Sequence, residues 1–334
     1  MTRAAIWLLT AGLLLFIGVL LSQGLSAVFS TLALAGWGLI WVALFHLLPL
    51  WMDAAAIHVL FDRAGRKAGS WRDALLVRWI GESANSLMPA GQLGGPALMI
   101  RQLSQRGMQI ESAVAAITVS TTLQTLAQIV FALLGLVLLG ARASQTGQHD
   151  PRIPVLIASA VLAVPMVSFY WLQRRGLFGK MLRAATRFSG KQEWLSLMSR
   201  AEAIDTALQS TYNRRAQAAA SCGWSLLGWI VGAGEVYLIL QLLGNPVGWV
   251  DALVLESLGQ AIRGAAFAIP GSLGVQEGGY LLLAPLAGLT PQVALALSLA
   301  KRARELLLAV PGLVYLHLSE RVWRRRSACA PAGE

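Results

Sequence analysis

The chain has 334 residues, of which 56% are hydrophobic and only 13% are charged, and its mean hydropathy is +0.61. A soluble domain of this size carries more charge, so the composition predicts an all-α polytopic membrane protein. The formal net charge is +11, but the basic residues lie in short segments between apolar runs. This pattern is typical of cytoplasmic loops and argues against a nucleic-acid partner. Two cysteines give no disulfide framework, and no metal-ligand spacing is present, so no metal or cofactor is expected.

The first two apolar runs are predicted to span the membrane. Ala4 to Leu21 has spanning length and is interpreted as a retained helix rather than a cleaved signal peptide. A second run extends from Thr31 to about Leu60. Within it, His46 and Asp53 share a helical face at a spacing of seven, which we interpret as an interfacial pair. The basic segment that follows, residues 62–73, is predicted to be cytoplasmic.

The next apolar region, residues 74–107, is interrupted by proline and glycine. Leu75 to Leu87 is too short and too charged to span the membrane alone. Proline and glycine stop a helix, and non-helical backbone at membrane depth is tolerated only inside protein or along a watery cavity. We therefore predict a re-entrant helical hairpin, with a loop at the membrane surface as the alternative. The predicted break residues are Pro89, Gly91, Gly94 and Gly95.

The middle of the chain alternates spans with one long polar segment. Ala113 to Leu139 is predicted to span outward, and Pro154 to Leu172 to return. Residues 173–216 form a basic cytoplasmic linker, in which apolar residues between 194 and 208 recur at helical spacing. This spacing predicts an amphipathic helix on the inner leaflet, with a solvated connecting helix as the alternative. Ala218 to Leu243 is predicted to span outward again.

A second interrupted segment, residues 251–288, resembles the first. Its break residues are Pro270, Gly271 and Gly274. Arg263 lies seven residues before Pro270, just as Glu82 lies seven residues before Pro89. Paired interrupted segments in corresponding halves predict an inverted repeat with a binding site between the halves.

The predicted repeat halves cover about residues 1–172 and 217–318, followed by a basic tail, residues 319–334. Pro291 to Leu318 is the last predicted span. The whole arrangement comprises about six spanning helices and two re-entrant hairpins that enter from opposite faces. Since the strongly basic segments all fall on one side, both termini are expected in the cytoplasm, with the protein in a bacterial-type inner membrane.

Ten ionisable residues lie within these apolar segments: Arg78, Glu82, Glu235, Glu256, Arg263, Glu277, Lys301, Arg302, Arg304 and Glu305. Each costs about 2.5–3.5 kcal/mol on insertion scales, so such groups pair with one another or face a cavity. We expect internal salt bridges, for instance Glu82 with Arg263 or Glu277 with Arg302, around a polar cavity.

Guanidinium groups and hairpin amides in such a cavity suit a polar or anionic headgroup whose tails remain in lipid. This combination predicts a lipid flippase, whereas a transporter of aqueous solutes is the alternative. No phosphate-binding loop or nucleophilic constellation is present, so the chain is not expected to be an enzyme. A non-transporting accessory protein that scaffolds lipid-biosynthesis enzymes is the rival interpretation.

Two short motifs resemble the transmembrane, flippase-like domain of the lysylphosphatidylglycerol synthase family. They are Asn85-Ser86-Leu87-Met88-Pro89 with Gly94-Gly95, and Ile269-Pro270-Gly271 with Gly274-Val275-Gln276-Glu277, followed by Arg302. The resemblance implies a lipid-translocating fold and a substrate site that includes Asn85 as well as Glu82, Arg263, Glu277 and Arg302.

Gln92 and Gln276 stand where this family commonly has basic residues, which argues against an aminoacylated phospholipid as the substrate. No soluble aminoacyl-transferring domain follows Arg326, so lipid aminoacylation is not expected. Short members of this kind resemble the branch associated with hopanoid biosynthesis.

Overall fold

The structure is a computed structural model that describes residues 30, 33–61, 69–87, 94–146, 194–265, 269 and 272–329. Several predictions fall outside these residues and are neither supported nor contradicted. They are the spans Ala4 to Leu21 and Pro154 to Leu172, residues 173–193 of the linker, and the break residues Pro89, Gly91, Pro270 and Gly271.

All of the described secondary-structure elements are helices, with no β-strand among the described residues, so the predicted all-helical class is confirmed. The elements are α3 (Gly38–His58), α4 (Trp71–Leu87), α5 (Gly94–Gln105), α6 (Ile110–Thr146), α9 (Trp194–Asn213), α10 (Arg215–Leu242), α11 (Trp249–Ala265), α12 (Val275–Leu283), the 3-10 turn η3 (Ala284–Ala287) and α13 (Pro291–Cys329). Three described segments are long and apolar enough to cross a membrane: Gly38–His58, Ile110–Ala141 and Arg215–Leu242. The chain is therefore a helical membrane protein.

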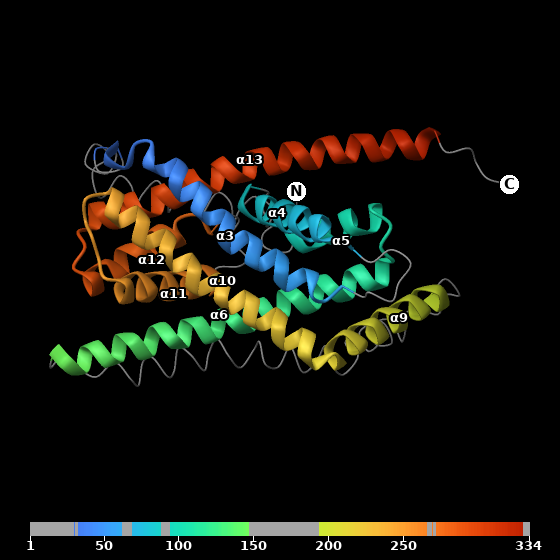
Figure 1. The fold of residues 1–334 in the computed structure, drawn as a ribbon, viewed down its shortest axis with the longest axis horizontal. Coiled ribbons are helices and arrows are strands. Elements are labelled where there is room, and N and C mark those ends of the chain that lie inside the picture. Colours follow the sequence, from blue (N-terminus) through green and yellow to red (C-terminus); the bar gives the residue numbers. More distant parts are fainter. Residues whose placement is uncertain are drawn as a thin grey trace.

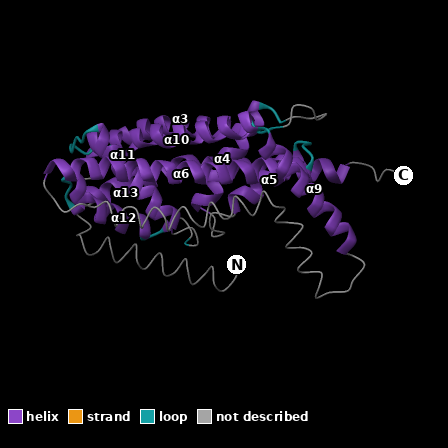
Figure 2. Ribbon diagram, turned by 90° about the horizontal axis from the view of Figure 1, so that it is seen from below, coloured by secondary structure: helices purple, strands orange, loops and turns teal. Residues whose placement is uncertain are grey.

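The helices form an elongated bundle (Figure 1, Figure 2). Helices α3 and α10 pack side by side across it, and α6 packs against α10, α11 and α9. Helix α13 packs against α4 and α12 and extends well beyond them (Figure 1). The shorter pairs α4/α5 and α11/α12 pack against these long helices.

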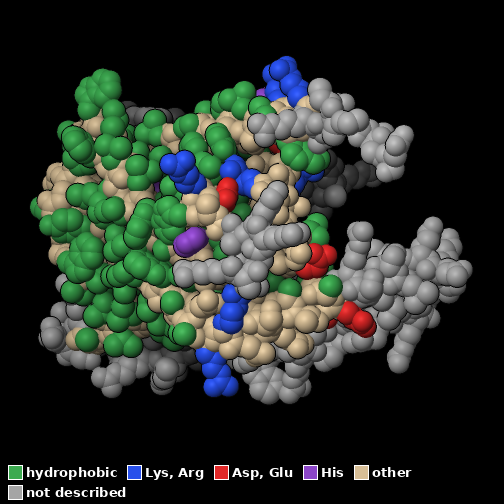
Figure 3. All heavy atoms as spheres, turned by 45° about the vertical axis from the view of Figure 1, so that its right-hand side comes forward, with side chains coloured by type: hydrophobic (Ala, Val, Ile, Leu, Met, Phe, Trp, Pro, Cys, Tyr) green, Lys and Arg blue, Asp and Glu red, His purple; other side chains and the backbone are tan. Residues whose placement is uncertain are grey.

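The distribution of side chains is the reverse of that in a soluble helix bundle. In α13, Lys301, Arg304 and Glu305 are at most 5% exposed, whereas Leu306 and Val310 are about half exposed. Figure 3 shows hydrophobic side chains covering most of one half of the visible face. Charges inside and apolar groups outside are expected where the surrounding solvent is lipid.

Small residues let the short helices of each pair approach closely. A Cβ on Gly95 of α5 would lie 2.5 Å from the carbonyl oxygen of Gly81 in α4, so only glycine fits there. The Asn85 side-chain oxygen also accepts a 2.9 Å hydrogen bond from the Gly95 amide, which ties the start of α5 to α4. In the second pair, Gly274 precedes α12 with a φ of +76°, a conformation that favours glycine. Both positions thus favour glycine on local geometry, and their assignment as breaks in re-entrant hairpins stays a prediction.

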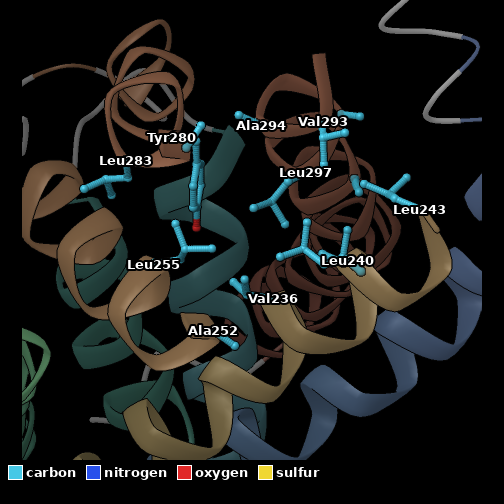
Figure 4. Packing of buried hydrophobic residues seen from close by; sticks show 14 of the residues in the cluster. Val236, Leu240, Leu243, Ala252, Leu255, Tyr280, Leu283, Val293, Ala294 and Leu297 are labelled. Atoms are coloured by element: carbon cyan, nitrogen blue, oxygen red, sulfur yellow. The ribbon is translucent and has the colours of Figure 1, made fainter. Parts of the chain in front are cut away.

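The largest apolar core lies where α10, α11, α12 and α13 meet (Figure 4). Tyr280 of α12 stands among Leu255, Val236 and Leu297 in this view. Its ring is 2% exposed, and these neighbours are also buried. This core fixes α12 against α11 and α13, which carry much of the buried charge described below.

Helix α9 matches the amphipathic segment predicted within the linker. It packs against α6 and buries Leu208 and Tyr212, and Arg214 donates a 3.0 Å hydrogen bond to the Leu60 carbonyl. Its apolar face therefore contacts the bundle rather than solvent, and its position on the inner leaflet stays a prediction.

Candidate functional site

A cavity of about 230 Å³ lies inside the bundle, at the junction of the long helices and the two short pairs. Its walls come from α3, α4, α5, α6, α10, α11 and α13, together with Ser272. Its described lining contains five carboxylates, Asp53, Glu82, Glu235, Glu256 and Glu305, and four permanent cations, Arg78, Arg263, Lys301 and Arg304. A cavity this charged inside an apolar bundle is the strongest candidate for a functional site.

The centre of the charged network is His46 of α3. Its Nδ1 lies 2.8 Å from Glu235 Oε2 of α10, and its Nε2 lies 2.8 Å from Glu82 Oε1 of α4. Arg304 of α13 contacts the same group: Nε donates to Glu235 Oε1 at 3.1 Å, and Nη1 lies 3.3 Å from Glu82 Oε1. Four helices therefore meet at one ionic cluster, which we call the His46 cluster (His46, Glu82, Glu235 and Arg304).

A second group of charges links α13 to α11 and α12. Lys301 Nζ donates to Glu256 Oε2 at 2.6 Å and lies 4.0 Å from Glu235. The Tyr280 hydroxyl donates to the same Glu256 oxygen at 3.1 Å. Because Lys301 is 1% exposed, its ammonium is stabilised by these protein groups rather than by water.

The third group surrounds the break before α12. Arg263 Nη1 donates to Glu305 Oε1 and, at 3.1 Å, to Gln276 Oε1. Arg302 donates through Nε to Glu277 Oε1 at 3.1 Å and through Nη2 to the Ser272 carbonyl at 3.2 Å. Arg302 thus holds the positive-φ residue Ser272 in place at the end of the break.

The remaining wall is polar but less charged. Arg78 forms an ion pair with Asp53, and Gln124 of α6 donates a 2.8 Å hydrogen bond to Asp53. Gln128 of α6 donates to the Gln260 carbonyl of α11 at 2.8 Å. Helix α6 therefore contributes amides and hydroxyls to the cavity and brings none of the charged groups among its described lining.

The structure brings together some predicted site residues and separates others. Glu82, Asn85 and Arg263 line the cavity, whereas Glu277 and Arg302 lie behind its wall. The predicted pair of Glu277 with Arg302 is present. The predicted pair of Glu82 with Arg263 is not formed, because Glu82 pairs with His46 and Arg304 while Arg263 pairs with Glu305.

The interpretation of His46 and Asp53 as an interfacial pair was wrong. Both residues line the cavity, and each of their side chains is 14% exposed. Their shared helical face was visible in the sequence, but that face points to the centre of the bundle. The presence of further carboxylates on other helices, including Glu82 and Glu235, was the signal that could have placed them there.

The fold and the site define a helical membrane protein with a pocket lined by charged side chains. The chain belongs to the family described as the lysylphosphatidylglycerol synthase TM region, whose profile matches residues 6–312. The family relationship expected from the sequence motifs is therefore confirmed. No curated protein and no solved structure matches the chain.

Proposed function

We propose that the protein is an inner-membrane lipid translocase of the flippase type, which moves a polar or anionic lipid through its central cavity. The observation that carries this proposal is the set of paired charges around a cavity of about 230 Å³ within an apolar bundle. A lipid headgroup needs a polar environment at membrane depth, while its tails lose nothing by remaining in lipid. The family relationship supports a role connected with membrane lipids.

The charge pairing suggests how a headgroup would be bound. Each permanent cation in the described lining contacts a carboxylate, so the cavity offers no large excess of positive charge. A headgroup would instead exchange hydrogen bonds with groups that are already held in place. Arg263, with a side chain 19% exposed, can still donate toward the cavity through its remaining N–H groups. Hopanoid lipids are the substrate class that the sequence resemblance suggests.

The proposed mechanism uses α4/α5 and α11/α12 as two re-entrant hairpins of an inverted repeat, with about six spanning helices and both termini in the cytoplasm. The equivalent positions of Glu82 and Arg263 support this arrangement, since they contact the neighbouring residues Arg304 and Glu305 of α13. Each pair would then be able to uncover the cavity toward one leaflet. No catalytic step is proposed.

The test is translocation of fluorescent polar lipids by the purified protein in liposomes. Arg263→Ala removes a cavity donor, and Arg101→Ala removes a comparable side chain from a surface ion pair with Glu320. We expect R263A to slow translocation at least about tenfold, the effect of losing about 1.4 kcal/mol of stabilisation, and R101A to leave it unchanged. Glu277→Gln tests the indirect role of Arg302 and should reduce the rate less. Equal rates in R263A and R101A would contradict this site.

The second candidate is a non-transporting accessory protein for lipid-biosynthesis enzymes, which the lipid-related family also accommodates. It predicts that the unmodified protein gives no translocation above that of protein-free liposomes and that such enzymes co-purify with it. If the protein is a lipid translocase, identification of the lipids that co-purify with it would give the substrate class.

A further inference from the structure

His46 lies between two carboxylates in a way that requires an additional proton. Its two ring nitrogens are each 2.8 Å from a carboxylate oxygen, of Glu235 and Glu82 respectively. An ionised carboxylate only accepts hydrogen bonds, and a neutral imidazole has only one N–H to donate. Arg304 Nη1, 3.0 Å from His46 Nε2, is a further donor and cannot supply the missing proton to the His46–Glu82 contact. A neutral imidazole that donates from Nδ1 to Glu235 and accepts at Nε2 from a protonated Glu82 and from Arg304 satisfies all of these contacts. An imidazolium satisfies both carboxylates but places its Nε2–H against the Arg304 donor, so in either form the cluster holds one additional proton.

The charges that line the cavity independently indicate one additional proton. The described lining has five carboxylates and four Arg or Lys side chains. One extra proton therefore makes the lining neutral. Net charge buried inside a membrane protein is costly, so the neutral form is favoured when the network is assembled as observed.

We propose that His46, Glu82 and Glu235 form a proton-binding site, and that release and uptake of this proton are coupled to lipid translocation. The coupling rests on the proposed function, whereas the proton site itself does not. The step forms and breaks only N–H or O–H bonds: a proton leaves the cluster to water on one side and is replaced from the other. The proton is thus the driving ion.

Loss of the proton would act mainly on α4. Glu82 is the more accessible carboxylate, with a side chain 25% exposed against 3% for Glu235. Without the proton one of the two carboxylates loses its hydrogen bond to His46, and Glu235 keeps Arg304 Nε at 3.1 Å. Glu82 would keep only its longer 3.3 Å contact with Arg304. The Glu82 position of α4 is therefore where contact with α3, α10 and α13 would weaken, while the Arg78–Asp53 pair still holds α4 to α3.

The surroundings of His46 are charged on every packed element except α6. Helix α4 provides Glu82 and Arg78, α10 provides Glu235, and α13 provides Lys301 and Arg304. Asp53 lies on α3 itself, and Glu256 faces the cavity from α11. Each of the other three carboxylates has its own cationic partner, Arg78 for Asp53, Lys301 for Glu256 and Arg263 for Glu305, which leaves Arg304 alone for Glu82 and Glu235. The additional proton is consequently assigned to the His46 cluster.

The proton site can be measured without any transport assay. The chain has four histidines, and replacing His58, His149 and His317 leaves His46 as the one ¹⁵N-labelled imidazole. We expect its NMR spectrum at neutral pH to show both ring nitrogens protonated, or else an infrared band of a protonated carboxyl that disappears in Glu82→Gln or Glu235→Gln. A neutral His46 ring with no such band would overturn the proposal.

Coupling is tested in liposomes that contain a pH-sensitive dye and fluorescent lipids. We expect an imposed pH gradient to change the translocation rate several-fold and lipid movement to be accompanied by proton flux. Proton flux should disappear in His46→Gln and Glu82→Gln. It should persist in His58→Gln, whose ring packs on Phe61 and Trp71 away from the cavity lining, and in Glu320→Gln.

The outcomes separate the two proposals. Translocation without proton flux or gradient dependence would overturn the coupling and leave the lipid function standing. No translocation under any gradient would overturn the lipid function, and the spectroscopy would still decide whether the cluster holds the proton.

Discussion

Replacing Arg304 by methionine should be among the most destabilising single changes in the protein. Arg304 is 4% exposed and contacts Glu235 at 3.1 Å, Glu82 at 3.3 Å and, more distantly, Glu305 at 3.8 Å. Removing one partner of a buried pair costs about 3–5 kcal/mol, because the other charge remains buried without compensation. We expect R304M to lower the free energy of unfolding by that amount in detergent–SDS titrations. Arg101→Met, at the exposed pair with Glu320, should cost no more than about 1 kcal/mol.

A double-mutant cycle identifies the cause of the R304M effect. If the cost comes from the uncompensated carboxylate, removing the charge of Glu235 should restore part of the stability. We expect R304M/E235Q to be more stable than the sum of the single effects predicts, by about 0.5–3 kcal/mol. Strict additivity, or an R304M cost equal to that of R101M, would refute the electrostatic account of the cluster.

Two further predictions concern the α4/α5 pair and its surroundings. Gly95→Ala places a Cβ 2.5 Å from the Gly81 carbonyl oxygen and should lower the free energy of unfolding by about 1–3 kcal/mol, measured as a lower thermal unfolding midpoint. The control is Gly140→Ala, whose Cβ has no atom within 4 Å and which should not destabilise the protein. At the start of α4, burial raises the pKa of Asp73, but hydrogen bonds from Ser70 and Arg106 outweigh this and hold it below its usual range. The contribution of ionised Asp73 to the free energy of unfolding is therefore present above the unfolded-state pKa and is lost as the pH falls through the pKa of the folded protein. Asp73→Asn should thus destabilise the protein at neutral pH and match the unmodified protein in strong acid. A loss of stability that does not depend on pH would contradict this.

Sequence patterns predicted the helices and the presence of buried charge better than they predicted the partners. The predicted segments Leu75 to Leu87 and Ala218 to Leu243 correspond closely to α4 (Trp71–Leu87) and α10 (Arg215–Leu242). Apolar length and helix-breaking residues decide such boundaries locally. Pairing depends on which helices are neighbours, and α13 supplied nearer partners for both Glu82 and Arg263 than they could supply for each other.

The role of His46 was missed for a related physical reason. Helix α3 is apolar on nearly all sides, so its pattern does not show which face turns inward. The pattern of such a helix is equally compatible with a histidine near the lipid headgroups and with one at the centre of the bundle. The carboxylates of α4 and α10 decide between these positions, and they are 36 and 189 residues away along the chain.

Helix α13 explains how two distant helix pairs could respond to one event. Within residues 301–305, Lys301 contacts Glu256 of α11, Arg302 contacts Glu277 of α12, Arg304 contacts Glu82 of α4, and Glu305 contacts Arg263 of α11. Glu82 and Arg263, which occupy equivalent positions in the two helix pairs, are held by the adjacent residues Arg304 and Glu305 of α13. A change of charge at Glu82 therefore alters the electrostatic field at Arg263. The two contacts have opposite polarity: α13 provides the base Arg304 to the acid Glu82, and the acid Glu305 to the base Arg263. A proton lost beside Glu82 would make the His46 cluster more negative and draw Arg304 toward Glu82 and Glu235 rather than Glu305. Glu305 would then hold Arg263 more tightly.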